Sequence, residues 1–193
     1  MNIPNKLTIL RIILVPVFLV LLINLNMPII AGIVFVIASL TDFADGKIAR
    51  KYNLVTNFGK FADPLADKLL VSAALIGLCA CSKLGTSYIL GAWAAFVIIA
   101  REFIVTGMRL IAATDGVVIA AAMSGKIKTV IQMITIIYIL FSKVLIYFGL
   151  PIGIYGVFSN VFVIASVIMT VYSGAEYIYK NKNLFKMKNK GDI

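Results

Sequence analysis

The sequence contains no histidine, only two cysteines and only eight acidic residues among 193. Without histidine the chain lacks the usual general base and the usual zinc or copper ligand, so any acid–base chemistry must use carboxylates, lysine or tyrosine. Cys79 and Cys81 are two positions apart in an apolar stretch. In a helix they face different directions, which argues against a mutual disulfide or a metal pair and predicts a packing role.

Charged residues are scarce throughout, at 13% against 62% hydrophobic residues, and the mean hydropathy is +1.04. A water-soluble domain of this size needs more polar surface, so the composition predicts an all-α integral membrane protein. No linker or internal repeat divides the chain, which indicates a single membrane-embedded domain over residues 1–193. Six apolar stretches are long enough to be transmembrane helices, at residues 7–26, 28–48, 60–82, 86–112, 125–149 and 153–178. A short, mildly amphipathic segment precedes the first.

The basic residues fall mainly on one side of this predicted topology. Only Lys83 and Lys143 of the 18 Lys and Arg residues lie toward the other side. Because cytoplasmic flanks collect positive charge, we predict a multi-pass protein of the cell membrane with both termini in the cytoplasm. A cleaved signal peptide is the alternative for residues 1–30, but no small-x-small cleavage site follows the apolar run.

Half of the acidic residues stand within one short segment, at Asp42, Asp45, Asp63 and Asp67. The first two are spaced i,i+3 and the last two i,i+4, so each pair can project from one face of its own helix. Carboxylates crowded together repel one another and are costly to remove from water, which implies bound cations or basic partners. Oxygen ligands without histidine or cysteine favour Mg²⁺ or Mn²⁺, and two such ions could bridge a diphosphate.

The residues between these acids suit a nucleotide diphosphate. Gly46 and Ala49 lack bulk on one helix face, and Gly59 precedes the next predicted helix, so a ligand could approach the backbone closely. Arg50 offers a fork of donors for phosphate oxygens, and Lys60 adds a second positive charge.

The whole segment, DFADGKIARKYNLVTNFGKFADPLAD, fits the pattern D-x2-D-G-x2-A-R-x8-G-x3-D-x3-D. This pattern resembles the signature of the CDP-alcohol phosphatidyltransferases, membrane enzymes that transfer a phosphatidyl or similar group from a CDP-linked donor to an alcohol. The resemblance implies six transmembrane helices, a cytoplasm-facing active site, two divalent cations and a homodimer. It assigns metal binding to Asp42, Asp45, Asp63 and Asp67, the catalytic base to Asp67, and the CDP-linked donor to Asp42, Gly46, Ala49, Arg50 and Gly59.

Pro64 directly follows Asp63, and a residue before proline is biased away from helical conformation. The simplest arrangement puts Pro64 in the first turn of the third helix, where its missing N–H costs little. Asp63 would then lie at or near the N-cap. A helix that begins much earlier would need a kink at this position.

Basic and polar residues elsewhere on the same membrane face predict an anionic acceptor. They are Thr8 and Arg11 near the N-terminus, Arg101 and Arg109 in the fourth apolar stretch, and Lys126 and Lys128 at the start of the fifth. The i,i+3 spacing of Thr8 and Arg11 and the eight-residue spacing of Arg101 and Arg109 predict that each pair shares one helix face. With these segments, the chain resembles family members that use sn-glycerol 3-phosphate as the acceptor and CDP-diacylglycerol as the donor. The expected partners are therefore these two substrates, the lipid bilayer and a second copy of the chain, and not a nucleic acid.

Several alternatives remain open at this point. Within the family, the acceptor could instead be the one used in cardiolipin, phosphatidylserine or inositol phosphate transfer. The acids could form a salt network with neighbouring lysines and arginines, or line the path of a cation transporter. Lys126 and Lys128 could anchor a helix at the membrane interface, with Arg101 paired to Glu102.

Overall fold

The computed structural model describes the backbone of residues 2–51, 57–81, 91–114, 122–149 and 151–182, and their side chains except those of residues 3, 4, 43–51, 57–61, 113, 114, 142 and 143. Within these ranges every regular element is a helix, which confirms the predicted all-α class. The elements are α1 (Ile3–Leu19), its π-helical continuation η1 (Val20–Asn24), α2 (Pro28–Lys51), α3 (Asn57–Ala80), α4 (Ala92–Thr114), α5 (Met123–Leu140), α6 (Ser142–Tyr147) and α7 (Ile152–Lys180).

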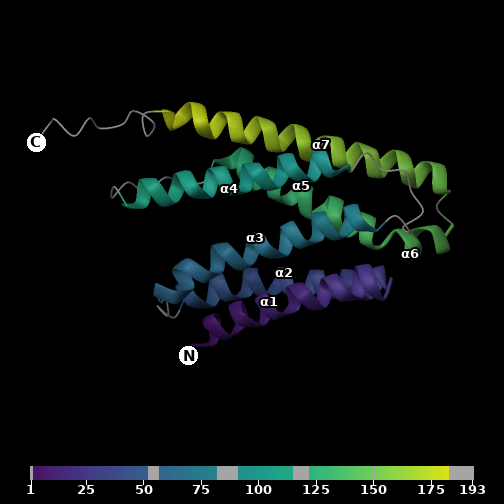
Figure 1. Cartoon of the computed structure of the whole chain (residues 1–193), viewed down its shortest axis with the longest axis horizontal. Helices are drawn as coiled ribbons and strands as arrows, with labels where there is room; N and C mark the ends of the chain where they lie inside the picture. The colour runs from purple at the N-terminus through teal and green to yellow at the C-terminus, as the bar shows by residue number, and fades with distance from the viewer. Residues whose placement is uncertain (1, 52–56, 82–90, 115–121, 150, 183–193) are drawn as a thin grey trace, which may run out of the picture.

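The helices form two groups that lie against each other (Figure 1). In the N-terminal group α1 packs along both α2 and α3, and in the C-terminal group α7 packs along both α4 and α5. Contacts of α3 with α4 and of α2 with α5 join the two groups. Because successive long helices alternate in direction, the N-terminal ends of α1 and α3 and the C-terminal ends of α2 and α4 all lie at the left of Figure 1. The segments with the predicted site residues therefore gather at one end of the molecule.

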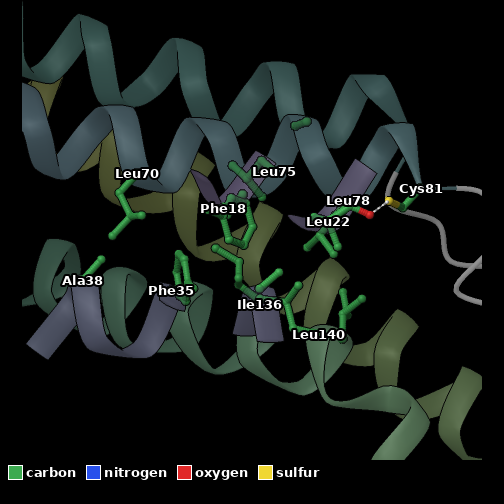
Figure 2. Packing of buried hydrophobic residues seen from close by; sticks show 14 of the residues in the cluster. Phe18, Leu22, Phe35, Ala38, Leu70, Leu75, Leu78, Cys81, Ile136 and Leu140 are labelled. Carbon is green, nitrogen blue, oxygen red and sulfur yellow. Dashed lines mark hydrogen bonds between the residues drawn. The ribbon is translucent and has the colours of Figure 1, made fainter. Parts of the chain in front are cut away.

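A shared hydrophobic core holds the two groups together (Figure 2). Phe18 of α1 and Phe35 of α2 are fully buried, with their ring centroids 6.0 Å apart. Leu75 of α3 and Ile136 of α5 belong to the same buried cluster. Cys81, at the edge of this core, donates its thiol hydrogen to the carbonyl of Leu22 at 3.3 Å. Cys81 belongs to this buried cluster and Cys79 packs against it, which agrees with the predicted packing role.

The outward surface of the bundle is apolar, whereas many residues between the helices are polar. Leucine, isoleucine, valine and phenylalanine are exposed along the long helices. Thr135 of α5 and Ser166 of α7 are buried instead, and their hydroxyls are 2.8 Å apart. Thr135 also donates to the carbonyl of Phe162 at 3.2 Å. In lipid, helices associate through small residues and interhelical hydrogen bonds, so this distribution is that of an integral membrane protein.

Three helical segments in the described ranges are long and apolar enough to cross a membrane: Asn5–Asn24, Met123–Leu140 and Ile152–Lys180. Pro28–Asp42 is a shorter apolar helix. The predicted boundaries need two changes. The N-terminal amphipathic segment is not separate, because α1 begins at Ile3 with a proline in its first turn, where the missing N–H costs little. The fifth stretch is divided at Phe141 into α5 and α6.

Candidate functional site

Two of the predicted aspartates are contacted by side chains of α1. The Arg11 guanidinium donates to Asp42 of α2, with Nη1 2.6 Å from Oδ1. One turn earlier on α1, the Thr8 hydroxyl donates to Asp63 of α3 at 2.5 Å. The spacing of Thr8 and Arg11 predicted that they share a helix face, and both are fully buried. Residues of α1 thus connect the two helices that bear the aspartates.

Asp67 lies one helical turn after Asp63 on α3, and its side chain is 45% exposed. Its Oδ2 is 4.0 Å from the ammonium of Lys68. Electrostatic interactions also link the Asp67 carboxylate to Asp42, Glu102 and Arg11. Three of the four predicted aspartates therefore belong to one neighbourhood, which we call the acidic cluster: Asp42, Asp63 and Asp67.

The aspartates of the acidic cluster and their partner Arg11 differ in solvent exposure. The Arg11 side chain is completely covered, yet its partner Asp42 remains 42% exposed. Asp67 is exposed to a similar degree. The arginine is therefore a fixed internal partner, while the carboxylates of Asp42 and Asp67 still face open space from which a ligand could approach.

The other predicted motif residues are placed only by their backbone. Asp45, Gly46, Ala49 and Arg50 lie in α2, and Gly59 and Lys60 lie in the first turn of α3. Their side chains are outside the described set, so the predicted roles of these residues in binding metal and the CDP-linked donor remain predictions. Among the side chains that are described, no three His, Cys, Asp or Glu groups lie close enough to hold one metal ion.

The prediction for Pro64 was wrong. Helix α3 begins at Asn57, so Pro64 lies inside the helix and not in its first turn. Asp63 is accordingly a residue of the helix interior and not an N-cap. Proline removes one backbone donor within a helix. Tertiary contacts such as the Thr8–Asp63 hydrogen bond help to hold this turn against the local bias of the sequence.

A second group of charged residues, which we call the basic cluster, consists of Arg101 and Glu102 of α4 and Lys128 of α5. One carboxylate oxygen of Glu102, Oε1, accepts from Arg101 Nη1 at 2.8 Å and from Lys128 Nζ at 2.6 Å. The Lys128 side chain is only 1% exposed. The pairing of Arg101 with Glu102 that the sequence left open is therefore present, and Lys128 joins the same pair.

Two glycines lie beside the Arg101 side chain, and the one on α7 leaves it the space it needs. A Cβ atom on Gly174 of α7 would lie 3.1 Å from Arg101 Cγ, and one on Gly125 of α5 would lie 3.6 Å from Arg101 Nη2. The arginine therefore passes close to both helices before it reaches Glu102. A larger residue at position 174 would press on the stem of Arg101.

The remaining predicted acceptor-site residues lie on the same helices. Arg109 of α4 is exposed, and its guanidinium carbon is 5.5 Å from the centre of the Tyr177 ring on α7. Arg101 and Arg109 therefore both face α7, as their spacing of eight residues predicted. Lys126 of α5 is exposed, unlike its near neighbour Lys128.

The two clusters lie within electrostatic range of each other, with Lys128 attracting Asp67 and the carboxylates of Asp67 and Glu102 repelling each other. Sequence reasoning considered Glu102 only as a local partner of Arg101, and it missed Gly174 and Tyr177. A single acidic residue in an otherwise basic and apolar segment was a sequence signal for Glu102. No local signal pointed to the two α7 residues, because their role depends on how α7 packs against α4.

Comparison with known proteins agrees with this arrangement. A protein from Bacillus subtilis named CDP-diacylglycerol–glycerol-3-phosphate 3-phosphatidyltransferase is 44% identical, covering 97% of this chain and 99% of the relative. A protein of the same name from Rickettsia bellii is 38% identical, covering 95% and 97% respectively. A Mycobacterium tuberculosis protein named probable phosphatidylglycerophosphate synthase is 38% identical over 92% of this chain and 80% of its own length. The sequence model of the CDP-alcohol phosphatidyltransferases matches residues 1–172, so the chain belongs to that family.

Proposed function

We propose that this protein transfers the phosphatidyl group from CDP-diacylglycerol to sn-glycerol 3-phosphate, forming phosphatidylglycerophosphate and CMP in phospholipid biosynthesis. Relatives named for this reaction match nearly the whole chain. The structural observation that carries the proposal is the juxtaposition of an acidic and a basic cluster, linked through Asp67, Glu102 and Lys128. A nucleotide diphosphate needs charge neutralisation at one part of the site, and a phosphorylated acceptor needs donors at another.

The acidic cluster suits a hard divalent cation. Its donors are carboxylate oxygens, and Asp42 and Asp67 remain partly exposed. Asp42, Asp45, Asp63 and Asp67 would hold two Mg²⁺ or Mn²⁺ ions. When bound, these ions would neutralise charge on the diphosphate and on the departing CMP.

Asp67 would act as the general base. In the proposed step the primary hydroxyl of glycerol 3-phosphate attacks the β-phosphorus of CDP-diacylglycerol, and Asp67 takes the hydroxyl proton. A new phosphorus–oxygen bond forms to the acceptor, while the bond to CMP breaks and CMP leaves with the electron pair. The partial exposure of Asp67 leaves it accessible to such a hydroxyl.

The protein's own cations would hold the two substrates. Arg50 and Lys60, with the small residues Gly46, Ala49 and Gly59, would contact the CDP part of the donor. The acceptor phosphate would be bound by Arg101, Arg109, Lys126 and Lys128. Thr8 and Arg11 would close the acceptor site from α1, where their hydrogen bonds to Asp63 and Asp42 keep them beside the acidic cluster.

We further propose six membrane crossings, with α2, α3 and α4 as the additional spans. Helices of 24, 24 and 23 residues at about 1.5 Å per residue are long enough for a hydrocarbon core of about 30 Å. The excess of basic residues at the end that carries the site supports a cytoplasmic active site and cytoplasmic termini in the cell membrane. A homodimer is part of the same family-based proposal.

A competition assay tests the proposed reaction. Purified protein receives CDP-diacylglycerol and Mg²⁺ or Mn²⁺ with glycerol 3-phosphate, serine, inositol phosphate or phosphatidylglycerol, and CMP release is measured for each. We expect CMP release with glycerol 3-phosphate, and its loss when a chelator removes the metal. Preference for another acceptor would reassign the reaction within the family. Metal flux in sealed vesicles without CMP formation would point to a transporter instead.

A further inference from the structure

Glu102 is shared between two cations that come from different helices. Its Oε1 accepts hydrogen bonds from Arg101 of α4 and from Lys128 of α5, at 2.8 and 2.6 Å. It is the acidic partner in a basic region and does not belong to the aspartate motif on α2 and α3. Its place between the two helices makes it a candidate for controlling where the cationic groups lie.

The burial of Lys128 shows why this pairing matters. Its side chain is 1% exposed, and Glu102 itself is 17% exposed. A buried ammonium group without a counter-charge is strongly unfavourable, so the Glu102 carboxylate is the group that stabilises Lys128 at this position. The exposed pair of Lys180 with Glu176 on α7, in which the lysine side chain is 63% exposed, has the same chemistry without that constraint.

The Glu102 carboxylate accepts only some of the hydrogen bonds that the cations of the basic cluster can donate. An ammonium group has three donors and a guanidinium group has five, and the Glu102 oxygen accepts one from each. The Arg101 Nε atom is buried and has no hydrogen-bond partner among the described residues. Two cations around one carboxylate also leave a net positive charge. The cluster therefore retains both the charge and the donors that a phosphate group requires.

The position of the cluster relative to Asp67 gives it a role in orientation. Lys128 interacts electrostatically with Asp67 as well as with Glu102, and Asp67 interacts with Glu102. A phosphomonoester held by the basic cluster would therefore lie within electrostatic range of the proposed base. If the cations moved, the acceptor hydroxyl would lose its alignment with Asp67.

We propose that Glu102 is a positioning residue for the acceptor site. It holds the Arg101 guanidinium against the buried Lys128 ammonium, so that the remaining N–H groups of Arg101, reinforced by the positive charge of Lys128, bind a phosphomonoester dianion whose hydroxyl faces Asp67. This inference rests on the proposed function, and it adds a role for an acidic residue in recognition of an anionic acceptor. Glu102 acts through the two cations and does not itself touch the substrate.

The first test replaces Glu102 with glutamine, which keeps the shape and removes the charge. We expect the KM for glycerol 3-phosphate to rise about tenfold or more, because charge-assisted hydrogen bonds lose their partner. The KM for CDP-diacylglycerol should change less than about threefold, since the donor site lies on other helices. The matched control is Glu176→Gln, which removes the carboxylate of an exposed pair and should leave both KM values unchanged.

A double variant separates positioning from a merely structural role. Glu102→Gln with Lys128→Gln removes both charges, so the fully buried cation is no longer left without a counter-charge, and only the partly exposed Arg101 loses its carboxylate partner. If Glu102 acts through Lys128, the double variant should have an acceptor KM no better than that of Lys128→Gln alone. A structural role predicts instead that thermal stability and acceptor KM both recover in the double variant, and that result would overturn the proposal.

Failure of the proposed reaction can be distinguished from failure of the positioning role of Glu102. If the unmodified protein releases no CMP with glycerol 3-phosphate, the proposed reaction fails. If the unmodified protein uses glycerol 3-phosphate normally and Glu102→Gln leaves its KM unchanged, only the positioning role of Glu102 fails.

Discussion

The acidic and basic clusters are built from different charge ratios. In the acidic cluster, the three carboxylates of Asp42, Asp63 and Asp67 outnumber the buried Arg11 and the nearby Lys68. In the basic cluster, Glu102 is shared by two cations. Among the side chains that the structure describes, the first cluster thus has excess negative charge and the second has excess positive charge. Each cluster therefore contains opposite charges that stabilise it in an apolar bundle, but these charges do not neutralise it completely.

This difference predicts different kinetic consequences. Changes in the acidic cluster should affect the chemical step, because its carboxylates are assigned to metal binding and proton transfer. Changes around the basic cluster should affect the acceptor concentration that is needed, because its donors are assigned to the acceptor phosphate. Measurements of kcat and of both KM values therefore test whether the two clusters have separate roles.

The largest effect is expected for Asp67→Asn. The amide cannot accept the hydroxyl proton, so kcat for CMP release should fall by about 100-fold or more. The fold should be retained, because Asp67 is partly exposed and its ion pair with Lys68 is long, at 4.0 Å. Thermal unfolding in detergent checks the fold. Full turnover by this variant would show that Asp67 is not the base. It would also argue against assigning the chemical step to the acidic cluster.

An intermediate effect is expected for Arg109→Gln. Loss of one charge-assisted contact to the acceptor phosphate should raise the KM for glycerol 3-phosphate by about tenfold, with a much smaller change for CDP-diacylglycerol. Initial-rate measurements at varied concentrations of each substrate provide the comparison. If the acceptor dependence is unchanged, the contact of Arg109 with the Tyr177 ring is a packing feature and the residue lies outside the acceptor site.

The smallest effect is expected for Gly174→Ala. The added Cβ would lie 3.1 Å from Arg101 Cγ, so the arginine must shift slightly and the KM for glycerol 3-phosphate should rise about threefold. Gly153→Ala on the same helix is the control, because a Cβ there meets nothing within 4 Å. Equal KM values for the two variants would show that the path of Arg101 past α7 has no influence on the acceptor.

Residues whose roles depend on periodicity along one helix could be predicted from the sequence. The shared face of Thr8 and Arg11, and that of Arg101 and Arg109, follow from helical spacing, and the structure confirms both. Pro64 was misplaced because the local preference of the residue before proline was given too much weight. Tertiary packing extends α3 back to Asn57 despite that preference.

Other features depend on contacts between helices that are distant in sequence. The sharing of Glu102 between α4 and α5 requires those helices to bring positions 102 and 128 together. The role of Gly174 likewise exists only because α7 lies against α4 at Arg101. A sequence shows which side chains lie on one face of a helix. Which positions of two helices come into contact is set by the packing of the entire bundle.

The burial of Arg11 has a consequence for the biogenesis of the protein. Its carboxylate partner Asp42 is on the next helix and the partner of Thr8, Asp63, is on the one after that. When the first helix enters the bilayer during synthesis, neither aspartate has yet been delivered beside it. Exposing an arginine to lipid costs about 2.5–3.5 kcal/mol at the centre of a spanning helix, so we expect α1 to gain its full stability only after α2 and α3 have joined it.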